Sequence, residues 1–174
     1  MIKEKINVLL IENNPADIRL IKYNIQKIVP LAVFKVSNDL SEIKELLYDF
    51  LPNIIFCDYH LDGFSGLEVL DFLKKSKYRA PLIFITGQIH DEELAADTIL
   101  AGASGYILKK DMKILYKKLL PYFDRLHDNL FLSKIEMNEL HKQHKELMEK
   151  LKDLIEENNY YKKVIEDNSD KRSQ

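Results

Sequence analysis

Five short apolar runs, each followed by a helical pattern, constrain the fold of this chain more than any other feature. The predicted strands cover residues 6–11, 32–36, 53–57, 82–86 and 105–108. Continuous apolar runs that alternate with helices are typical of a parallel sheet that is buried on both faces. The sequence therefore predicts an α/β fold with a doubly wound, five-stranded parallel sheet.

Helix signals fall between the predicted strands. Asn14 followed by Pro15 indicates the start of the first helix, because Asn is a favoured N-cap and Pro is favoured at the first helical position. Asp39 and Glu42 have the spacing of a capping box for the second helix. The remaining helices are predicted at residues 67–76, from Asp91 to the glycines of AGASG, and from residue 112 onward.

From Pro121 onward the sequence has no predicted strand and follows a seven-residue repeat with Phe123 at an a position. A repeat sustained over about six heptads predicts a coiled coil. Asn158 at an a position favours a parallel homodimer, because facing amides pair only in register; antiparallel and tetrameric arrangements stay open. The predicted dimer seam consists of Leu126, Leu130, Met137, Leu140, His144, Leu147, Leu151, Leu154 and Asn158.

Composition narrows the possible functions. The formal charge of −2 over 174 residues argues against a nucleic-acid partner, which usually requires a basic face. No apolar run is long enough for a membrane span or a signal-peptide core, so no membrane partner is expected. Cys57 is the single cysteine and lies in an apolar run, which favours a buried thiol. Because one cysteine cannot form an internal disulfide, we expect a cytoplasmic protein in a reducing compartment. The chain has no phosphate-binding glycine motif and no G-x-S-x-G, and we expect no ordinary enzymatic activity.

Polar residues follow the predicted strands at their carboxyl ends. Glu12 and Asn13 follow the first strand, Asp58 follows the third, Thr86 ends the fourth and Lys109 follows the fifth. In open parallel sheets, ligands bind beyond the carboxyl ends of the strands. We therefore expect these side chains to gather at one edge of the sheet.

Four stretches in this order, VLLIENNPADIRLI, PNIIFCDYHLDGFSGLEVL, PLIFITGQ and AGASGYILKK, resemble the receiver domain of bacterial two-component response regulators over residues 5 to about 120. The resemblance implies a flavodoxin-like sheet of strand order 2-1-3-4-5. It also implies that Asp58 accepts a phosphoryl group from a histidine kinase or a phosphotransfer protein. The implied Mg²⁺ ligands are Glu12, Asn13, Asp58 and the backbone carbonyl of His60, and the implied switch residues are Thr86, Tyr106 and Lys109.

Asn13 departs from the family pattern, which has an acid pair at this place. With an effective dielectric constant of about 20, one charge ~4 Å from a divalent ion gives a gross attraction of about 8 kcal/mol. Desolvation cancels most of this, but a retained ~1.4 kcal/mol already means tenfold weaker binding. Two hypotheses follow: a weaker but working magnesium site with phosphorylation of Asp58, or a degenerate receiver that acts as a dimeric docking scaffold without phosphorylation.

The predicted domains are a receiver domain at residues 1–120, a coiled-coil helix at 121–168 and a polar tail at 169–174. His141 and His144, in HKQH, more often belong to a helix surface than to a metal site, because no nearby acid or cysteine completes a ligand set. The last residues, NNYYKKVIEDNSD, resemble the segment that precedes a PAS sensory domain. The hypothesis that the native chain is longer and continues into such a domain therefore stays open. The cognate kinase and the output are not identified by any motif.

Overall fold

The computed structural model describes residues 2–76, 78–87 and 92–170, and it describes the side chains of these residues except 92–94 and 161–170. The chain divides into two compact units, Met1–His127 and Asp128–Gln174. The predicted start of the fourth helix at Asp91 lies outside the described residues. The predicted domain boundaries after residues 120 and 168 remain predictions.

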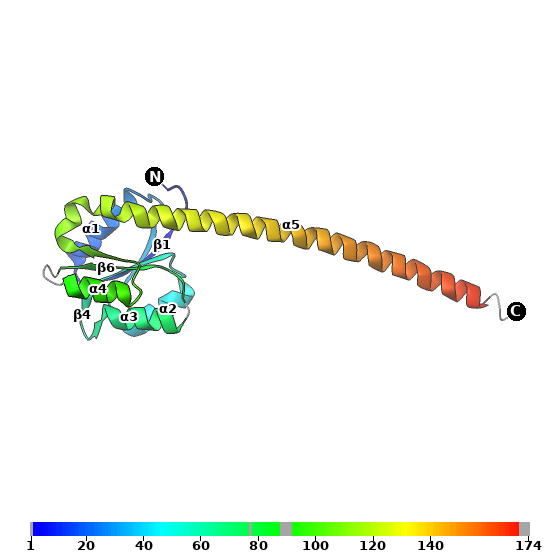
Figure 1. The fold of residues 1–174 in the computed structure, drawn as a ribbon, viewed down its shortest axis with the longest axis horizontal. Coiled ribbons are helices and arrows are strands. Elements are labelled where there is room, and N and C mark those ends of the chain that lie inside the picture. The colour runs from blue at the N-terminus through cyan, green and yellow to red at the C-terminus, as the bar shows by residue number, and fades with distance from the viewer. Residues whose placement is uncertain (1, 77, 88–91, 171–174) are drawn as a thin grey trace. The chain divides into compact units, whose positions relative to one another are not determined.

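The first unit is built on a five-stranded parallel sheet with the order β2-β1-β3-β6-β7 (Figure 1). Its strands are β1 (Asn7–Ile11), β2 (Val33–Ser37), β3 (Ile54–Cys57), β6 (Leu82–Thr86) and β7 (Gly105–Leu108). Counted along this sheet alone, the order is 2-1-3-4-5, so the predicted fold is confirmed. The winding direction switches between β1 and β3, which is where such sheets bind ligands.

The helices lie where their sequence signals predict them, to within a few residues. They are α1 (Pro15–Gln26), α2 (Leu40–Asp49), α3 (Gly66–Lys75), α4 (Glu92–Leu100) and α5 (Leu115–Asp170). A 3-10 helix, η1 (Lys109–Ile114), precedes α5 and was not predicted. Among the described residues, no helix is both long enough and apolar enough to cross a membrane.

The predicted cap of α1 is confirmed, and that of α2 is confirmed in part. The side-chain oxygen of Asn14 accepts hydrogen bonds from the first turn of α1. Asp39 caps α2 by accepting from the backbone amides of Ser41 and Glu42. The Glu42 carboxylate does not close the box on Asp39: it accepts from the Ser37 hydroxyl at 2.5 Å, and the Asp39 amide donates to the same hydroxyl at 3.1 Å. The Ser37 hydroxyl therefore lies between the Asp39 amide and the Glu42 carboxylate, where the predicted box has a direct hydrogen bond.

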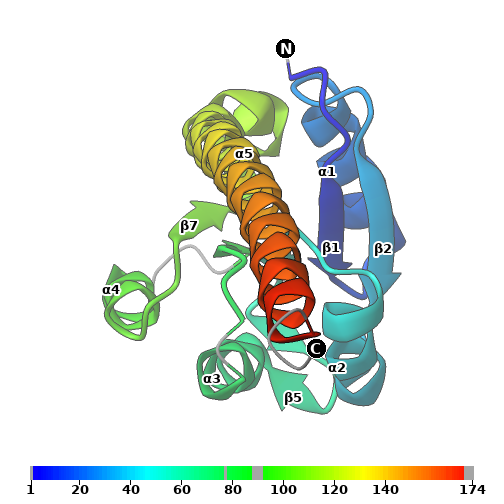
Figure 2. The same ribbon diagram turned by 90° about the vertical axis from the view of Figure 1, so that its right-hand side faces the viewer.

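Apolar residues alternate between the two faces of the sheet, so each face has its own core. On one face, α2 and α3 pack against a cluster that includes Leu9, Cys57 and Phe84. On the other, the Phe56 ring contacts Phe123 of α5, with ring centroids 6.1 Å apart. At the edge of the sheet, α4 contacts β7 (Figure 2).

A buried asparagine ties α1 to the start of α5. The side chain of Asn24 donates to the backbone carbonyls of Leu20 at 2.8 Å and Met112 at 3.4 Å, and it accepts from the Tyr116 amide at 3.3 Å. Asn24 is only 2% exposed, so these bonds satisfy an amide that would otherwise lie buried without partners. They fix α1 against η1, the segment that begins with Lys109.

The beginning of the predicted dimer seam lies in the core of the first unit. Leu126 is 8% exposed and Phe123 is fully buried. The seam residues from Met137 to Asn158 are all exposed. An apolar stripe that packs against a sheet has almost the same spacing as a coiled-coil seam. The sequence repeat therefore assigned core residues at the start of α5 to the predicted seam.

We predict that the first turns of α5 stabilise the first unit strongly. Phe123→Ala removes a fully buried ring and should lower the free energy of unfolding by about 3–5 kcal/mol. Phe131→Ala on the same helix removes an exposed ring and should change it by less than about 0.5 kcal/mol. Urea denaturation followed by circular dichroism measures both, and equal effects would contradict the burial of Phe123 in the core.

Candidate functional site

Acidic and basic side chains meet at the carboxyl edge of the sheet, as predicted. Glu12 follows β1, Asp58 follows β3 and Lys109 follows β7. The backbone amide of Asp58 donates to the carbonyl of Ile11 at 2.8 Å, which places Asp58 directly beside the end of β1. Glu12 is 3% exposed and Asp58 is 8% exposed. The carboxylates therefore lie in a site with little solvent.

The Lys109 ammonium lies at the point where three carboxylates meet. Its Nζ is 2.6 Å from Asp58 Oδ2, 2.7 Å from Glu12 Oε2 and 2.8 Å from Asp17 Oδ2. Asp17 comes from the first turn of α1. An ammonium group has three N–H donors, so each carboxylate can receive one of them.

The carboxylates also determine the charge of Lys109. Burial acts to lower the pKa of Lys109, but hydrogen bonds to Asp17, Asp58 and Glu12 outweigh burial and raise the pKa well above its usual value. Lys109 therefore stays charged across the physiological pH range. Partly buried ion pairs of this kind are screened less by salt than exposed pairs.

Backbone and thiol contacts hold Asp58 from the other side. The His60 amide donates to Asp58 Oδ1 at 3.3 Å, and the Cys57 thiol donates to the Asp58 carbonyl at 3.0 Å. Burial raises the pKa of the Cys57 thiol, and the negative charges of Asp58 and Glu12 raise it further. The thiol is therefore neutral, which keeps it a donor.

A small hairpin follows Asp58 and was not predicted. It pairs β4 (His60–Leu61) with β5 (Phe64–Ser65), and Gly63 in its turn has a φ of 87°, which favours glycine. The dipeptide Asp62-Gly63 is a typical signal for such a two-residue turn. The hairpin carries Asp62 toward the end of β1.

Asn13 is the predicted metal ligand that breaks the acid pair. The amide nitrogen of its side chain points to the hairpin and not to the carboxylates around Lys109. Its Nδ2 donates to Asp62 Oδ2 at 2.9 Å. The backbone amides of Asn13 and Asn14 donate to Glu12 Oε1, at 3.1 and 2.9 Å, and orient the Glu12 side chain. At the end of β1, the Glu12 carboxylate therefore contacts Lys109, and the Asn13 amide contacts Asp62 of the hairpin.

The two remaining switch candidates lie on neighbouring strands. Thr86 ends β6, is 1% exposed and pairs in register with Leu108, the residue before Lys109. Tyr106 of β7 is half-buried and packs against the core cluster on the α2 and α3 face. Thr86 and Tyr106 therefore lie on β6 and β7, and Lys109 directly follows β7.

The charge of the site suits a divalent cation. Three carboxylates face one ammonium, which leaves two formal negative charges uncompensated. Hard oxygen ligands such as these carboxylates are what Mg²⁺ prefers. In the part of the chain that the structure describes, no three His, Cys, Asp or Glu side chains form a ready-made metal cluster. The carboxylates around Lys109 match Mg²⁺ in charge and in donor type, although they are not already arranged as a metal cluster.

Asp17 and Asp62 are the residues of this site that the sequence analysis missed. Asp17 was visible only as an acid in the first turn of a helix, a position that the helix dipole favours without any site. The Asp62-Gly63 dipeptide could have indicated the hairpin. Neither signal states which side chains the two acids contact.

Comparison with known proteins agrees with the geometry. The family model described as response regulator receiver domain matches residues 8–120. The chain belongs to this family. It is a receiver domain of two-component signalling, a class of domain that interacts with histidine kinases.

Curated relatives of this receiver domain are response regulators of greater length. The nitrate/nitrite response regulator protein homolog of Haemophilus influenzae is 32% identical over 112 residues, which are 62% of this chain and 51% of that protein. The nitrate/nitrite response regulator protein NarL of Escherichia coli is 27% identical over 112 residues, which are 62% of this chain and 49% of that protein. The chain spans about half the length of these relatives.

Solved structures confirm the receiver fold. The signal receiver domain of the DNA-binding response regulator merR from Colwellia psychrerythraea has a TM-score of 0.60 at 18% identity, covering 68% of this chain and 98% of that chain. The Mn²⁺-bound form of response regulator Rcp1 has a TM-score of 0.58 at 21% identity, covering 68% and 94%. The phosphorylated cyanobacterial phytochrome response regulator RcpA has a TM-score of 0.56 at 22% identity, covering 67% and 89%.

We predict that the receiver domain does not tolerate a side chain at Gly66. A Cβ there would lie 2.8 Å from the Asp58 carbonyl oxygen and would press on the Phe84 ring. Gly66→Ala should therefore lower the free energy of unfolding by about 1–3 kcal/mol. In Gly87→Ala the added Cβ meets only Lys109 Cδ, at 3.8 Å, and the change should stay within about 0.5 kcal/mol. Urea denaturation that gave both variants the same stability would disprove this close packing.

Proposed function

We propose that Asp58 accepts a phosphoryl group from the phosphohistidine of a histidine kinase or a phosphotransfer protein. The observation that carries this proposal is the buried Asp58 carboxylate with Lys109 Nζ at 2.6 Å. An ammonium at this distance can stabilise negative charge on an oxygen next to Asp58. The family of the chain and its sheet topology support the same function.

The transfer requires little covalent chemistry from the protein. A carboxylate oxygen of Asp58 attacks phosphorus, an O–P bond forms, and the P–N bond to the donor imidazole breaks as that nitrogen takes up a proton. The product is an acyl phosphate on Asp58. Alignment and charge neutralisation supply most of the rate in such reactions. The domain would act as an acceptor and not as an ordinary enzyme with a diffusible substrate.

Other residues of the site would act on the product. Lys109 would donate to a phosphoryl oxygen, and Thr86 would supply a hydroxyl donor from the adjacent strand. The movement of Thr86 would let the Tyr106 ring turn inward and change the surface formed by α4, β7 and the start of α5. Phosphorylation would thus reach the helix that continues into the second unit.

We propose Glu12 and Asp58 as the main protein ligands of Mg²⁺. The Asn13 side-chain oxygen and the His60 backbone carbonyl are the other predicted ligands. The hydrogen bond from Asn13 to Asp62 uses Nδ2, so it does not engage the oxygen that a metal would need. Bound Mg²⁺ would neutralise charge on the phosphoryl oxygens during transfer.

The first test is direct phosphorylation of the full chain. With acetyl phosphate and saturating Mg²⁺, mass spectrometry should find one phosphoryl group that hydroxylamine removes, as expected for an acyl phosphate. Asp58→Asn should abolish it, because the amide is not a nucleophile here. Asp124→Asn, which changes an exposed carboxylate on α5 outside the site, should retain it. No product in the unmodified chain at saturating Mg²⁺ would refute the proposal.

Asn13 favours a second candidate function. Its neutral amide lowers the charge at the end of β1, and its pairing with Asp62 fixes the hairpin without any metal. The alternative is a degenerate receiver that docks partners as a dimeric scaffold and does not need phosphorylation. A chain that fails to form acyl phosphate but still binds its partner would support this alternative.

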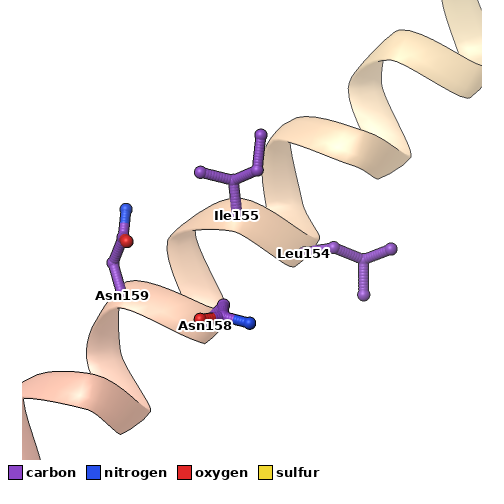
Figure 3. Close-up of a pocket in the computed structure, with 4 residues that line it drawn as sticks. All are labelled: Leu154, Ile155, Asn158 and Asn159. Atoms are coloured by element: carbon purple, nitrogen blue, oxygen red, sulfur yellow. The ribbon is translucent and has the colours of Figure 1, made fainter.

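We also propose that the second unit forms a parallel coiled-coil homodimer that passes the signal on. Its seam residues from Met137 onward are exposed in the single chain, and several are large and apolar. Figure 3 shows Leu154 and Asn158, which line a hollow on α5 together with Ile155 and Asn159. A second copy in register would cover this apolar face and pair Asn158 with its equivalent.

The cellular setting remains a proposal as well. The single, buried cysteine supports a reducing, cytoplasmic setting, and the formal charge of −2 supports the absence of direct nucleic-acid contact. Relatives such as EvgA of Escherichia coli are named as DNA-binding transcriptional activators, and this chain covers 50% of that protein. DNA binding is a property of that longer relative and is not proposed for this chain.

We predict that one acidic substitution in the seam dissociates the dimer. Leu147→Asp places two carboxylates in the dimer interior, which should cost about 3 kcal/mol and raise the dissociation constant roughly a hundredfold. Ile135→Asp provides the matched control, because Ile135 is exposed on the same helix but falls at an f position, opposite the seam. Sedimentation equilibrium measures both variants. A monomeric unmodified chain, or equal effects of the two changes, would contradict the dimer.

A further inference from the structure

Asp17 is an acidic residue of the site that the family resemblance did not assign. Its Oδ2 lies 2.8 Å from Lys109 Nζ, and its side chain is 23% exposed. The N-cap fixes its position, because Asn14 Oδ1 accepts from the backbone amides of Ala16 and Asp17. Asp17 therefore lies in a capped first turn of α1, within ion-pair distance of Lys109.

The position of Asp17 bears on the charge that Asn13 lacks. Two acids at the end of β1 together with Asp58 would give three carboxylates around one lysine. With Asn13 in place, Glu12 and Asp58 give only two. Asp17 brings the number that contact Lys109 back to three, although it comes from a helix and not from the strand end.

We infer that Asp17 replaces the charge missing at Asn13 and is a positioning residue that keeps Lys109 beside Asp58 and strengthens binding of a divalent cation. The inference rests on the proposed phosphorylation site, since it concerns the same cluster. Once a phosphoryl group occupies Asp58, Glu12 and Asp17 still hold the ammonium through two of its three donors. The third donor can then face a phosphoryl oxygen.

The test measures binding of Mn²⁺ to the full chain, without any phosphodonor. Electron paramagnetic resonance of free Mn²⁺ reports the bound fraction directly, and competition with Mg²⁺ gives the Mg²⁺ affinity. Asp17→Asn should weaken both about tenfold, because it removes one of the two uncompensated negative charges. Asp17→Glu, which keeps the charge, should bind within about threefold of the unmodified chain.

Two further variants separate this role from a general effect of charge or folding. Asp111→Asn is the matched control: Asp111 contacts Lys118 at 3.0 Å, and its side chain is also 23% exposed. It should leave Mn²⁺ affinity unchanged. The double variant Asn13→Asp with Asp17→Asn should recover the affinity, since it moves the charge back to the end of β1. Circular dichroism verifies that each variant is folded.

The possible results distinguish this inference from the proposed function. Unchanged affinity in Asp17→Asn, or equal losses in Asp17→Asn and Asp111→Asn, would overturn the role of Asp17 and leave phosphorylation of Asp58 intact. If the unmodified chain binds neither Mn²⁺ nor Mg²⁺ and forms no acyl phosphate, both proposals fail. Loss in Asp17→Asn with recovery in the double variant supports the role of Asp17.

Discussion

One ammonium group that contacts three carboxylates determines the arrangement of this site. Glu12, Asp17 and Asp58 would repel one another at such short separation, and each loses hydration on leaving water. Lys109 offsets part of this cost because its ammonium forms an ion pair with all three carboxylates and donates a hydrogen bond to Asp58. The ends of β1, β3 and β7 and the first turn of α1 are thereby held together through a single side chain.

Neutral contacts around the cluster set its distances. Asn24 links α1 to η1, so the helix that carries Asp17 and the segment that begins with Lys109 keep a fixed relation. On the opposite side, Gly66 lets α3 begin against the backbone of Asp58, where a larger residue would not fit. Ionic groups tolerate little displacement in a site of low dielectric. The uncharged supports are therefore as necessary to the chemistry as the charged groups.

The sequence predicted the sheet and the meeting of Asp58 with Lys109, because buried parallel strands are read from apolar runs and their carboxyl ends share one edge. It did not predict that Asp17 joins them, because the apolar spacing of α1 does not determine which polar side chains of its first turn contact the site. It also did not predict that Asn13 turns to the hairpin after β3. Leu126 was assigned to the dimer seam because periods of 3.6 and 3.5 residues barely differ over a few turns.

The burial of Cys57 has a practical consequence for following motion in this protein. The chain has no other cysteine, and this one lies in the core with a thiol pKa raised by burial and by neighbouring carboxylates. A second cysteine introduced at an exposed site such as Ser133 would therefore be the one reactive thiol in the native state. A spin label or a fluorophore could be attached there without first removing the native sulfur, whose hydrogen bond to Asp58 would stay in place.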